Sequence, residues 1–166
     1  MSTSALTERI NLTDADGDTL GSVTVHDARR LTVVALKFFA EAKRREGQSR
    51  SSSGPAYVVY RAGLRSDAGR LDKLAELLER EQLLVAGSAP DPAADPLNLR
   101  PIDLTVDALF SHADASRRNS RSRKLAGTAY KQHRQAWRER ADTCEAMAVA
   151  LRDGTLRLTH ATGGQA

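Results

Sequence analysis

The chain has 166 residues, of which 40% are hydrophobic and 28% are charged, and this balance is typical of a folded domain. No stretch approaches the roughly 18 apolar residues of a membrane-spanning helix, and the first residues lack the apolar region of a secretory signal. The single cysteine, Cys144, excludes an internal disulfide and a cysteine-based zinc site. We therefore expect a soluble cytoplasmic protein, or a virion protein if the chain is phage-encoded, with no membrane contact.

A β-hairpin is predicted at the start, with strands at 8–14 and 19–25, because apolar and polar residues alternate there. The alternation slips at Gly21-Ser22, which predicts a bulge. The acidic run at 14–18 between the strands is typical of a turn. A calcium loop beginning at Asp14 would need Gly and Glu where the chain has Thr19 and Val25, so we favour the turn.

Two helices are predicted next, over 27–46 and 67–85, from apolar residues at helical spacing. Asp27 is placed to cap the first helix, and Gly47 follows it where a C-cap glycine belongs. Ser66 or Asp67 would cap the second. One face of the first helix is expected to be core, namely Leu31, Val34, Ala35, Phe38 and Ala42, widened by Val33, Leu36 and Phe39. Between the helices, Tyr57–Tyr60 predicts a strand at 56–61.

Four of the five prolines lie in or next to residues 88–101, which predicts an extended connector. We expect three parts: a compact α+β unit at 1–87, the connector at 88–101, and a helical arm at 102–166 that ends in a short strand near 155–159. A break in the arm is expected near 116–122 or at Gly127. The predicted fold is mainly helical α+β: a small antiparallel sheet packed with two helices, plus a long basic C-terminal arm.

The positive charge of the chain is concentrated in this arm. Residues 115–140 contain nine basic residues and one acid, Glu139, for a net charge of +8. The whole chain carries +4, so the remainder carries −4. On a continuous helix the cations share a sector of roughly 140°: Arg117, Arg121, Lys124, Lys131, Arg134 and Arg138.

A separate stripe of apolar and small residues follows the same segment at alternating steps of three and four. It includes His133 and Cys144, which we expect to be packed, and Tyr130 and Trp137, which we expect at an interface. An uninterrupted helix over 116–152 would be about 55 Å long, longer than a compact domain of this size. A projecting helix with such a stripe needs a partner, so we expect a homo-oligomer or a subunit of a larger complex.

Three interpretations of the basic face remain open. It could be solvated or paired with acids of the same chain such as Glu76, Glu79 and Glu81; it could lie along nucleic-acid phosphates; or it could contact an acidic protein surface. The leading hypothesis is a non-enzymatic assembly or adaptor subunit that docks on nucleic acid or a nucleoprotein. The alternatives are a structural subunit that contacts only protein, for instance in a phage particle, and a small enzyme.

Motifs for enzyme or cofactor chemistry are not found in the sequence. There is no phosphate-binding P-loop, no dinucleotide-binding glycine motif and no zinc-protease motif. The four histidines are far apart, without metal-ligand spacing. We therefore expect no cofactor, no metal and no catalytic residue that can be named, and any nucleic-acid contact should be to the backbone and independent of base sequence.

Overall fold

The computed structural model describes residues 8–48, 54–87, 102–122 and 127–161. They form a mainly helical α+β fold, as predicted, with four helices and two small antiparallel sheets where a single sheet was predicted. The connector at 88–101 and the predicted phosphate ligand Lys124 lie outside the described residues.

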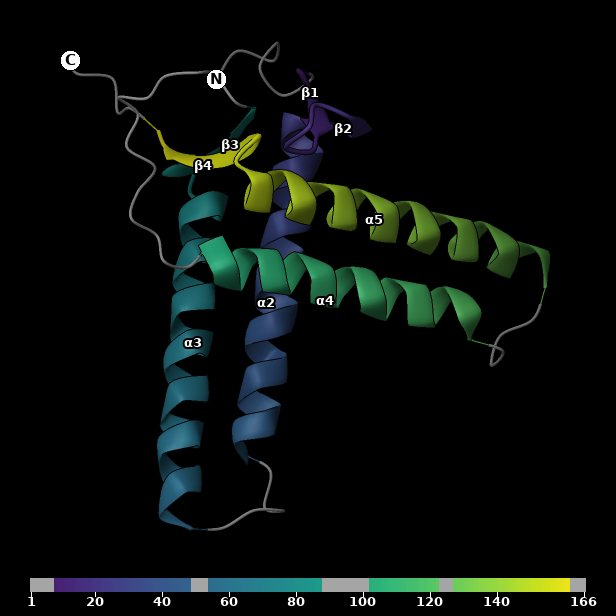
Figure 1. The fold of residues 1–166 in the computed structure, drawn as a ribbon. Coiled ribbons are helices and arrows are strands. Elements are labelled where there is room, and N and C mark those ends of the chain that lie inside the picture. Colours follow the sequence, from purple (N-terminus) through teal and green to yellow (C-terminus); the bar gives the residue numbers. More distant parts are fainter. Residues whose placement is uncertain (1–7, 49–53, 88–101, 123–126, 162–166) are drawn as a thin grey trace.

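The helices are arranged as two hairpins (Figure 1). Helices α2 (Val25–Gln48) and α3 (Pro55–Glu79) form the first, and α4 (Ile102–Arg121) and α5 (Thr128–Asp153) form the second. The α4–α5 hairpin crosses α2 near one end of the first hairpin and extends away from it, so that the molecule is L-shaped. We call this second hairpin the arm. Both sheets lie at the corner of the L.

Strands β1 (Arg9–Thr13) and β2 (Thr19–Thr24) form the predicted β-hairpin. Its turn is organised by the Asp14 carboxylate, which accepts hydrogen bonds from the backbone amides of Asp16 and Asp18, as an Asx-type turn requires. The register shifts by one residue between Leu12 and Thr13, leaving Leu20 without a cross-strand partner. The bulge therefore lies at Leu20, one position before the predicted Gly21-Ser22.

A second sheet joins distant parts of the chain. Strand β3 (Leu83–Gly87) pairs antiparallel with β4 (Leu156–His160), so the terminal strand forms as predicted. The predicted helix at 67–85 is wrong at both ends, because α3 begins at Pro55 and stops at Glu79, and Glu81 adopts a positive φ of 60°. That left-handed residue turns the chain from the helix into β3.

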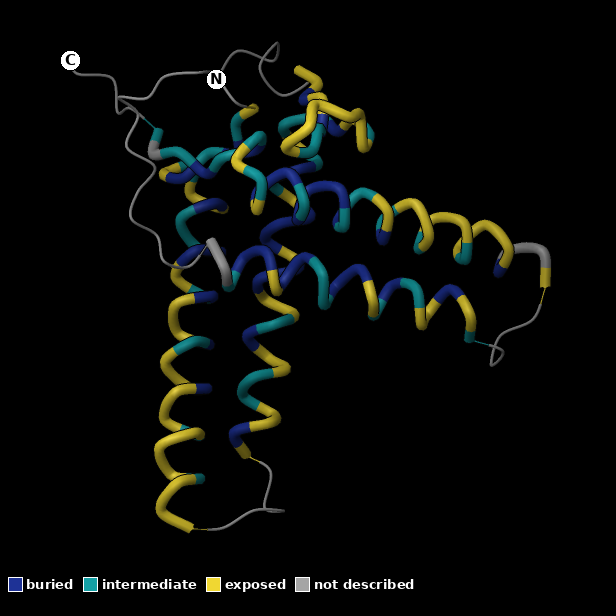
Figure 2. Tube along the Cα trace, in the orientation of Figure 1, coloured by how far each residue is buried: buried dark blue, intermediate teal, exposed yellow. Residues whose placement is uncertain are grey.

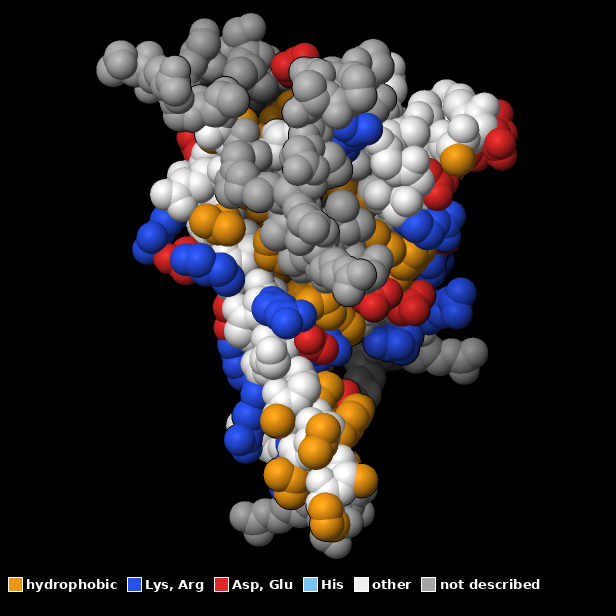
Figure 3. All heavy atoms as spheres, turned by 60° about the vertical axis from the view of Figure 1, so that its left-hand side comes forward, with side chains coloured by type: hydrophobic (Ala, Val, Ile, Leu, Met, Phe, Trp, Pro, Cys, Tyr) orange, Lys and Arg blue, Asp and Glu red, His pale blue; other side chains and the backbone are white. Residues whose placement is uncertain are grey.

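The predicted strand at 56–61 is wrong, since Tyr57–Tyr60 lie in the first turns of α3. Pro55 occupies the first helical turn, where its missing amide hydrogen is harmless, and Leu64 and Leu71 continue a helical pattern of buried residues. The large apolar side chains of these first turns remain outside the core. Val58 is 66% exposed and Val59 73%, and hydrophobic side chains gather at this free end of the first hairpin (Figure 3).

Helix α2 is longer than predicted at both ends. The Thr24 hydroxyl, not Asp27, caps it by accepting from the Asp27 amide at 3.1 Å, and Gly47 lies inside the helix, buried against Leu64. The predicted core face is also corrected in part. Val34 and Phe38 are each 41% exposed and Ala42 is exposed, whereas the positions that widen the face, Val33 and Leu36, are buried.

The core lies at the corner of the L, where both hairpins and both sheets meet (Figure 2). Every element except β2 contributes a leucine or methionine that is almost completely buried, among them Leu12, Leu36, Leu71, Leu83, Leu109, Met147 and Leu156, and β2 contributes Val23. Away from the corner, burial is confined to the seam between the paired helices. The arm is thus anchored at one end and exposed along its outer sides towards the tip.

Glycine positions in this fold give a stability test. Gly63 and Gly69 lie inside α3 with open space where the methyl group of an alanine would lie, so alanine should raise the free energy of unfolding by about 0.5–1 kcal/mol at each. Gly154 ends α5 with a φ of 79°, so Gly154→Ala should lower it by about 1–2 kcal/mol. Urea unfolding of the three variants measures both effects, and a Gly154→Ala protein as stable as the parent would contradict the assigned cap.

None of the helices within residues 8–48, 54–87, 102–122 and 127–161 combines the length and apolar character needed to cross a membrane.

Candidate nucleic-acid interface

The basic segment forms two antiparallel helices instead of one continuous helix. Helix α4 passes through Ser116 without interruption and ends at Arg121, and α5 begins after Gly127. Ser116 and Ser120 are buried in the seam of the arm, where their small side chains allow the helices to approach closely. Helix α4 thus ends inside the predicted range 116–122 and α5 begins at the other predicted break point, Gly127, so the predicted basic face is divided between α4 and α5.

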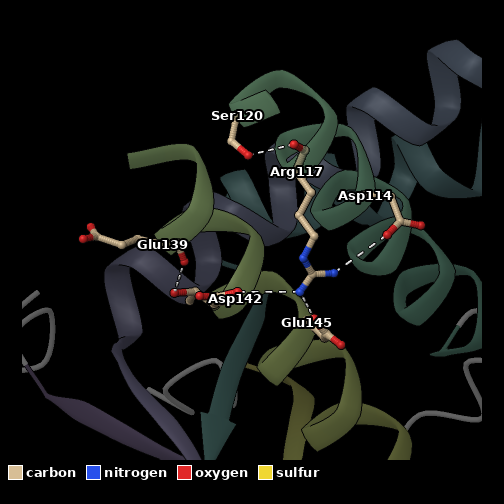
Figure 4. Close-up of polar contacts among 7 residues, drawn as sticks. Asp114, Arg117, Ser120, Glu139, Asp142 and Glu145 are labelled. Atoms are coloured by element: carbon tan, nitrogen blue, oxygen red, sulfur yellow. Dashed lines mark hydrogen bonds and ion pairs between the residues drawn. The ribbon is translucent and has the colours of Figure 1, made fainter. Parts of the chain in front are cut away.

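Arg117 is held by carboxylates from both helices (Figure 4). Its guanidinium lies 3.8 Å from the Asp114 carboxylate on α4 and 3.6 Å from Asp142 on α5, and it donates a hydrogen bond to Glu145 on α5. The Arg117 side chain is about one-third exposed. A cation already shared among three carboxylates is poorly placed to bind an added phosphate, and Arg117 instead joins α4 to α5.

This contact also shows that two stripes of charge lie side by side on one face of the arm. Residues three or four apart share one side of a helix. On α4, Arg121 therefore lies one turn from Arg117 on the same side of the helix. On α5, Arg138 lies one turn from Asp142 on the same side. Because Arg117 bridges the two helices, both stripes border the same face. The complete face holds Asp114, Arg117, Arg118 and Arg121 on α4, and Lys131, Arg134, Arg138, Asp142 and Glu145 on α5.

Charge on this face is divided along the length of the arm. The acids lie towards the corner of the L and the other cations lie towards the tip. We call the tip set, Arg118, Arg121, Lys131, Arg134 and Arg138, the distal cations. Four of them are exposed and Arg134 is half-buried. Arg134 donates to the Ser122 carbonyl at 3.1 Å and lies over the Tyr130 ring.

Within the described part of the chain, no carboxylate lies within 4.0 Å of any distal cation. The first hairpin differs. Several of its cations pair across the helices, as Lys37 does with Glu79 at 2.5 Å and Lys43 with Asp67 at 3.6 Å. The acids predicted as partners of the basic face are occupied there: Glu76 binds Lys73 and Arg80, Glu79 binds Lys37, and Glu81 binds Arg29. The five distal cations are thus gathered at one end of the arm without a carboxylate within 4.0 Å among the described residues, whereas the exposed Arg65 and Arg70, which also lack such a partner, lie on α3.

Tyr130 and Trp137, the two aromatic residues predicted at an interface, contact each other within the arm. Tyr130 is 7% exposed and its ring lies 6.3 Å from that of Trp137 in an edge-to-face contact. Trp137 is half-buried. These rings brace the tip of the hairpin, and their role at an interface stays a prediction. His133, which we predicted to be packed, is exposed because the seam turns away from it.

Cys144 is completely buried in the seam, as predicted. Burial raises the pKa of its thiol to about 11, while the positive charge of Arg140 acts weakly in the opposite direction. The reactive form of a cysteine is the thiolate. The side chain is therefore a small packed residue of the arm at neutral pH.

His112 gives the arm a pH-dependent stability. It is 8% exposed, packs edge-on against Phe38 at 5.5 Å, and neither ring nitrogen has a hydrogen-bond partner among the described residues. Burial, and secondarily the charge of Arg140, lower its pKa below the ordinary value of 6.5. The folded protein therefore holds His112 neutral at a pH where the unfolded chain binds a proton.

The contribution of neutral His112 to the free energy of unfolding should consequently be fully present above about pH 6.5. It should be lost progressively as the pH drops from there towards the folded-state pKa of His112. The variant His112→Phe keeps a ring against Phe38 and removes the titration. Urea unfolding at about pH 7.5 and pH 5.5 should show a smaller loss in the variant than in the parent protein. An equal loss in both would assign the pH dependence to other groups.

The described residues contain no group of three or more histidine, cysteine or acidic side chains able to hold a metal ion. No protein-family model, curated protein or solved structure matches the chain. The arrangement that remains is a projecting helical hairpin whose tip carries uncompensated positive charge. The sequence predicted four of the distal cations, Arg121, Lys131, Arg134 and Arg138, but neither Arg118 nor the Arg117 cluster. The only sequence signal of that cluster was the helical spacing that places Asp142 and Glu145 on the same side of α5 as Arg138.

Proposed function

We propose that this protein is a non-enzymatic assembly or adaptor subunit that docks on nucleic acid through the tip of its arm. The observation that carries the proposal is the set of distal cations, which project from the body and have no carboxylate partner among the described residues. Phosphates of a nucleic-acid backbone are the polyanion that such a surface suits, because each contact releases condensed counterions.

The geometry favours backbone contact over base reading. The distal cations come from two neighbouring helices, and a paired hairpin is roughly 20 Å wide from two helix diameters, whereas the major groove of B-form DNA is about 12 Å wide. The arm therefore rests on the phosphates and does not insert as a unit. Binding is then independent of base sequence, and base composition should alter the affinity little.

Arg117 is excluded from the phosphate-binding set in this proposal. Its three carboxylate partners would repel a phosphate that approached it. The same carboxylates confine the anion to the distal part of the arm. Arg121, Lys131, Arg134 and Arg138 keep their predicted role, Lys124 keeps it from the sequence alone, and Arg118 joins them because it is exposed at the same end.

Fluorescence anisotropy with labelled duplex and single-stranded oligonucleotides tests the proposal. If all five distal cations contact phosphates of a duplex, the logarithm of the association constant should fall against the logarithm of salt concentration with a slope of about −4 to −5. Two unrelated sequences should bind equally. Absence of binding at about 50 mM salt, or an affinity that does not change with salt, would contradict the proposal.

A further inference from the structure

The charges along the outer side of α5 are arranged so that the helix complements itself. Cations occupy 131, 134 and 138, and acids occupy 139, 142 and 145. The pattern changes sign at a point between Arg138 and Glu139. When two such helices lie antiparallel and cross at that point, every cation of one faces the acidic half of the other. This symmetry belongs to the folded helix, because steps of three and four place 131, 134, 138, 142 and 145 on one side, with Glu139 at its edge about 100° from Arg138.

A cavity lies at the acidic half of this surface. It has a volume of about 260 Å³ and is formed where α5 meets the β1–β2 hairpin. Glu139, Asp142, Thr143 and Ala146 line it from α5, and Leu12 and Leu20 line it from the hairpin. Leu20 is 38% exposed because the bulge leaves it without a cross-strand partner. The cavity thus combines an apolar wall with two carboxylates, of which Asp142 also lies 3.6 Å from Arg117 and stays 77% exposed.

A lysine or arginine side chain suits such a cavity, since its methylene stem packs on apolar surface while its charged end reaches an acid. In the antiparallel arrangement, position 131 of one helix lies opposite position 146 of the other. Ala146 lines the cavity, and Asp142 lies one turn, about 5–6 Å, nearer the crossing point. Lys131 of one copy therefore reaches the carboxylates in the cavity of the other.

We infer that α5 of this protein pairs antiparallel with α5 of a second copy, with the tip of each arm against the cavity of the other. The pairing has two-fold symmetry, so each contact occurs twice. Arg138 lies beside the second copy's Glu139 at the centre. This inference goes beyond the proposed function, because it concerns the protein without nucleic acid. The two are linked, since phosphates and the second copy compete for the same cations.

Sedimentation equilibrium of the nuclease-treated protein tests the pairing. We expect a monomer–dimer equilibrium at about 50 mM salt that shifts towards monomer at about 500 mM, because the contacts are largely between exposed charges. Either Arg138→Glu or Glu139→Arg sets like charges opposite each other twice, and should weaken dimerisation by about tenfold or more. The double variant Arg138→Glu/Glu139→Arg exchanges the two charges and should restore it.

Arg65→Glu provides the matched control, because Arg65 is an exposed cation on α3, away from the arm. It should leave the dimer unchanged. A protein that stays monomeric at high concentration and low salt would overturn the pairing, and so would a dimer that Glu139→Arg does not weaken. Glu139→Arg also separates the two proposals. It adds positive charge, so it should weaken the dimer and leave oligonucleotide affinity equal or higher.

Discussion

Reversing two distal cations, as Arg121→Glu with Arg138→Glu, is expected to reduce oligonucleotide affinity more than any other paired change in the described chain. Both side chains are exposed and have no ion-pair partner among the described residues. Each reversal removes a phosphate contact and adds a repulsive charge. The slope of log affinity against log salt concentration should become less negative by about two. Binding at about 200 mM salt should become undetectable.

The matched control is Arg65→Glu with Arg70→Glu. These α3 residues are also exposed, and the pair changes the net charge of the protein by the same amount. If affinity depended on net charge alone, the two double variants would lose it equally. We expect the α3 variant to keep the parent slope. Circular dichroism should show that both variants retain the helical content of the parent.

The largest stability loss is expected from Leu36→Ala. Leu36 is completely buried on α2, the helix that both hairpins share as a packing surface. Removing its isobutyl group and leaving a cavity should lower the free energy of unfolding by about 2–5 kcal/mol. Val34→Ala, two positions away and 41% exposed, should change it by less than about 1 kcal/mol.

Urea unfolding measures both variants. A Leu36→Ala protein within about 1 kcal/mol of the parent would contradict the packing described for the corner of the L. Below its melting temperature, Leu36→Ala should still bind oligonucleotides, because the distal cations lie at the tip of the arm and Leu36 packs at the corner of the L. Stability and binding would then be separable properties of the corner and of the tip of the arm.

The long periodic elements were predictable because they depend on patterns repeated over many residues. Helix α2 was expected over 27–46 and extends over Val25–Gln48, and the β-hairpin at the start has the expected turn at Asp14. Errors arose where a short local preference met a longer pattern. Tyr57–Tyr60 favour a strand in isolation, but Pro55 and the leucines that follow extend a helix through them.

At the end of α3, a pairing with a distant strand overrides the local helical pattern. Leu83 and Leu84 continue the apolar sequence pattern of the helix, yet they belong to β3, because β4 supplies a hydrogen-bonding partner more than seventy residues later. A pairing at that separation leaves no trace in the local sequence. The candidate site was predictable to the same extent: its local features could be read from the sequence, and its contacts between distant segments could not. The concentration of cations was visible in the sequence, whereas the Arg117 cluster required the antiparallel return of α5.

Nucleic acid is expected to contact the tip of the arm and no other surface of the described chain. Backbone amide NMR of this 18.0 kDa protein, titrated with a short duplex, locates the contact residue by residue. We expect chemical-shift changes concentrated at Arg118, Arg121, Lys131, Arg134 and Arg138, with α2 and α3 unchanged. Changes concentrated on the α2–α3 hairpin, or none at a saturating concentration of the duplex, would contradict docking through the arm.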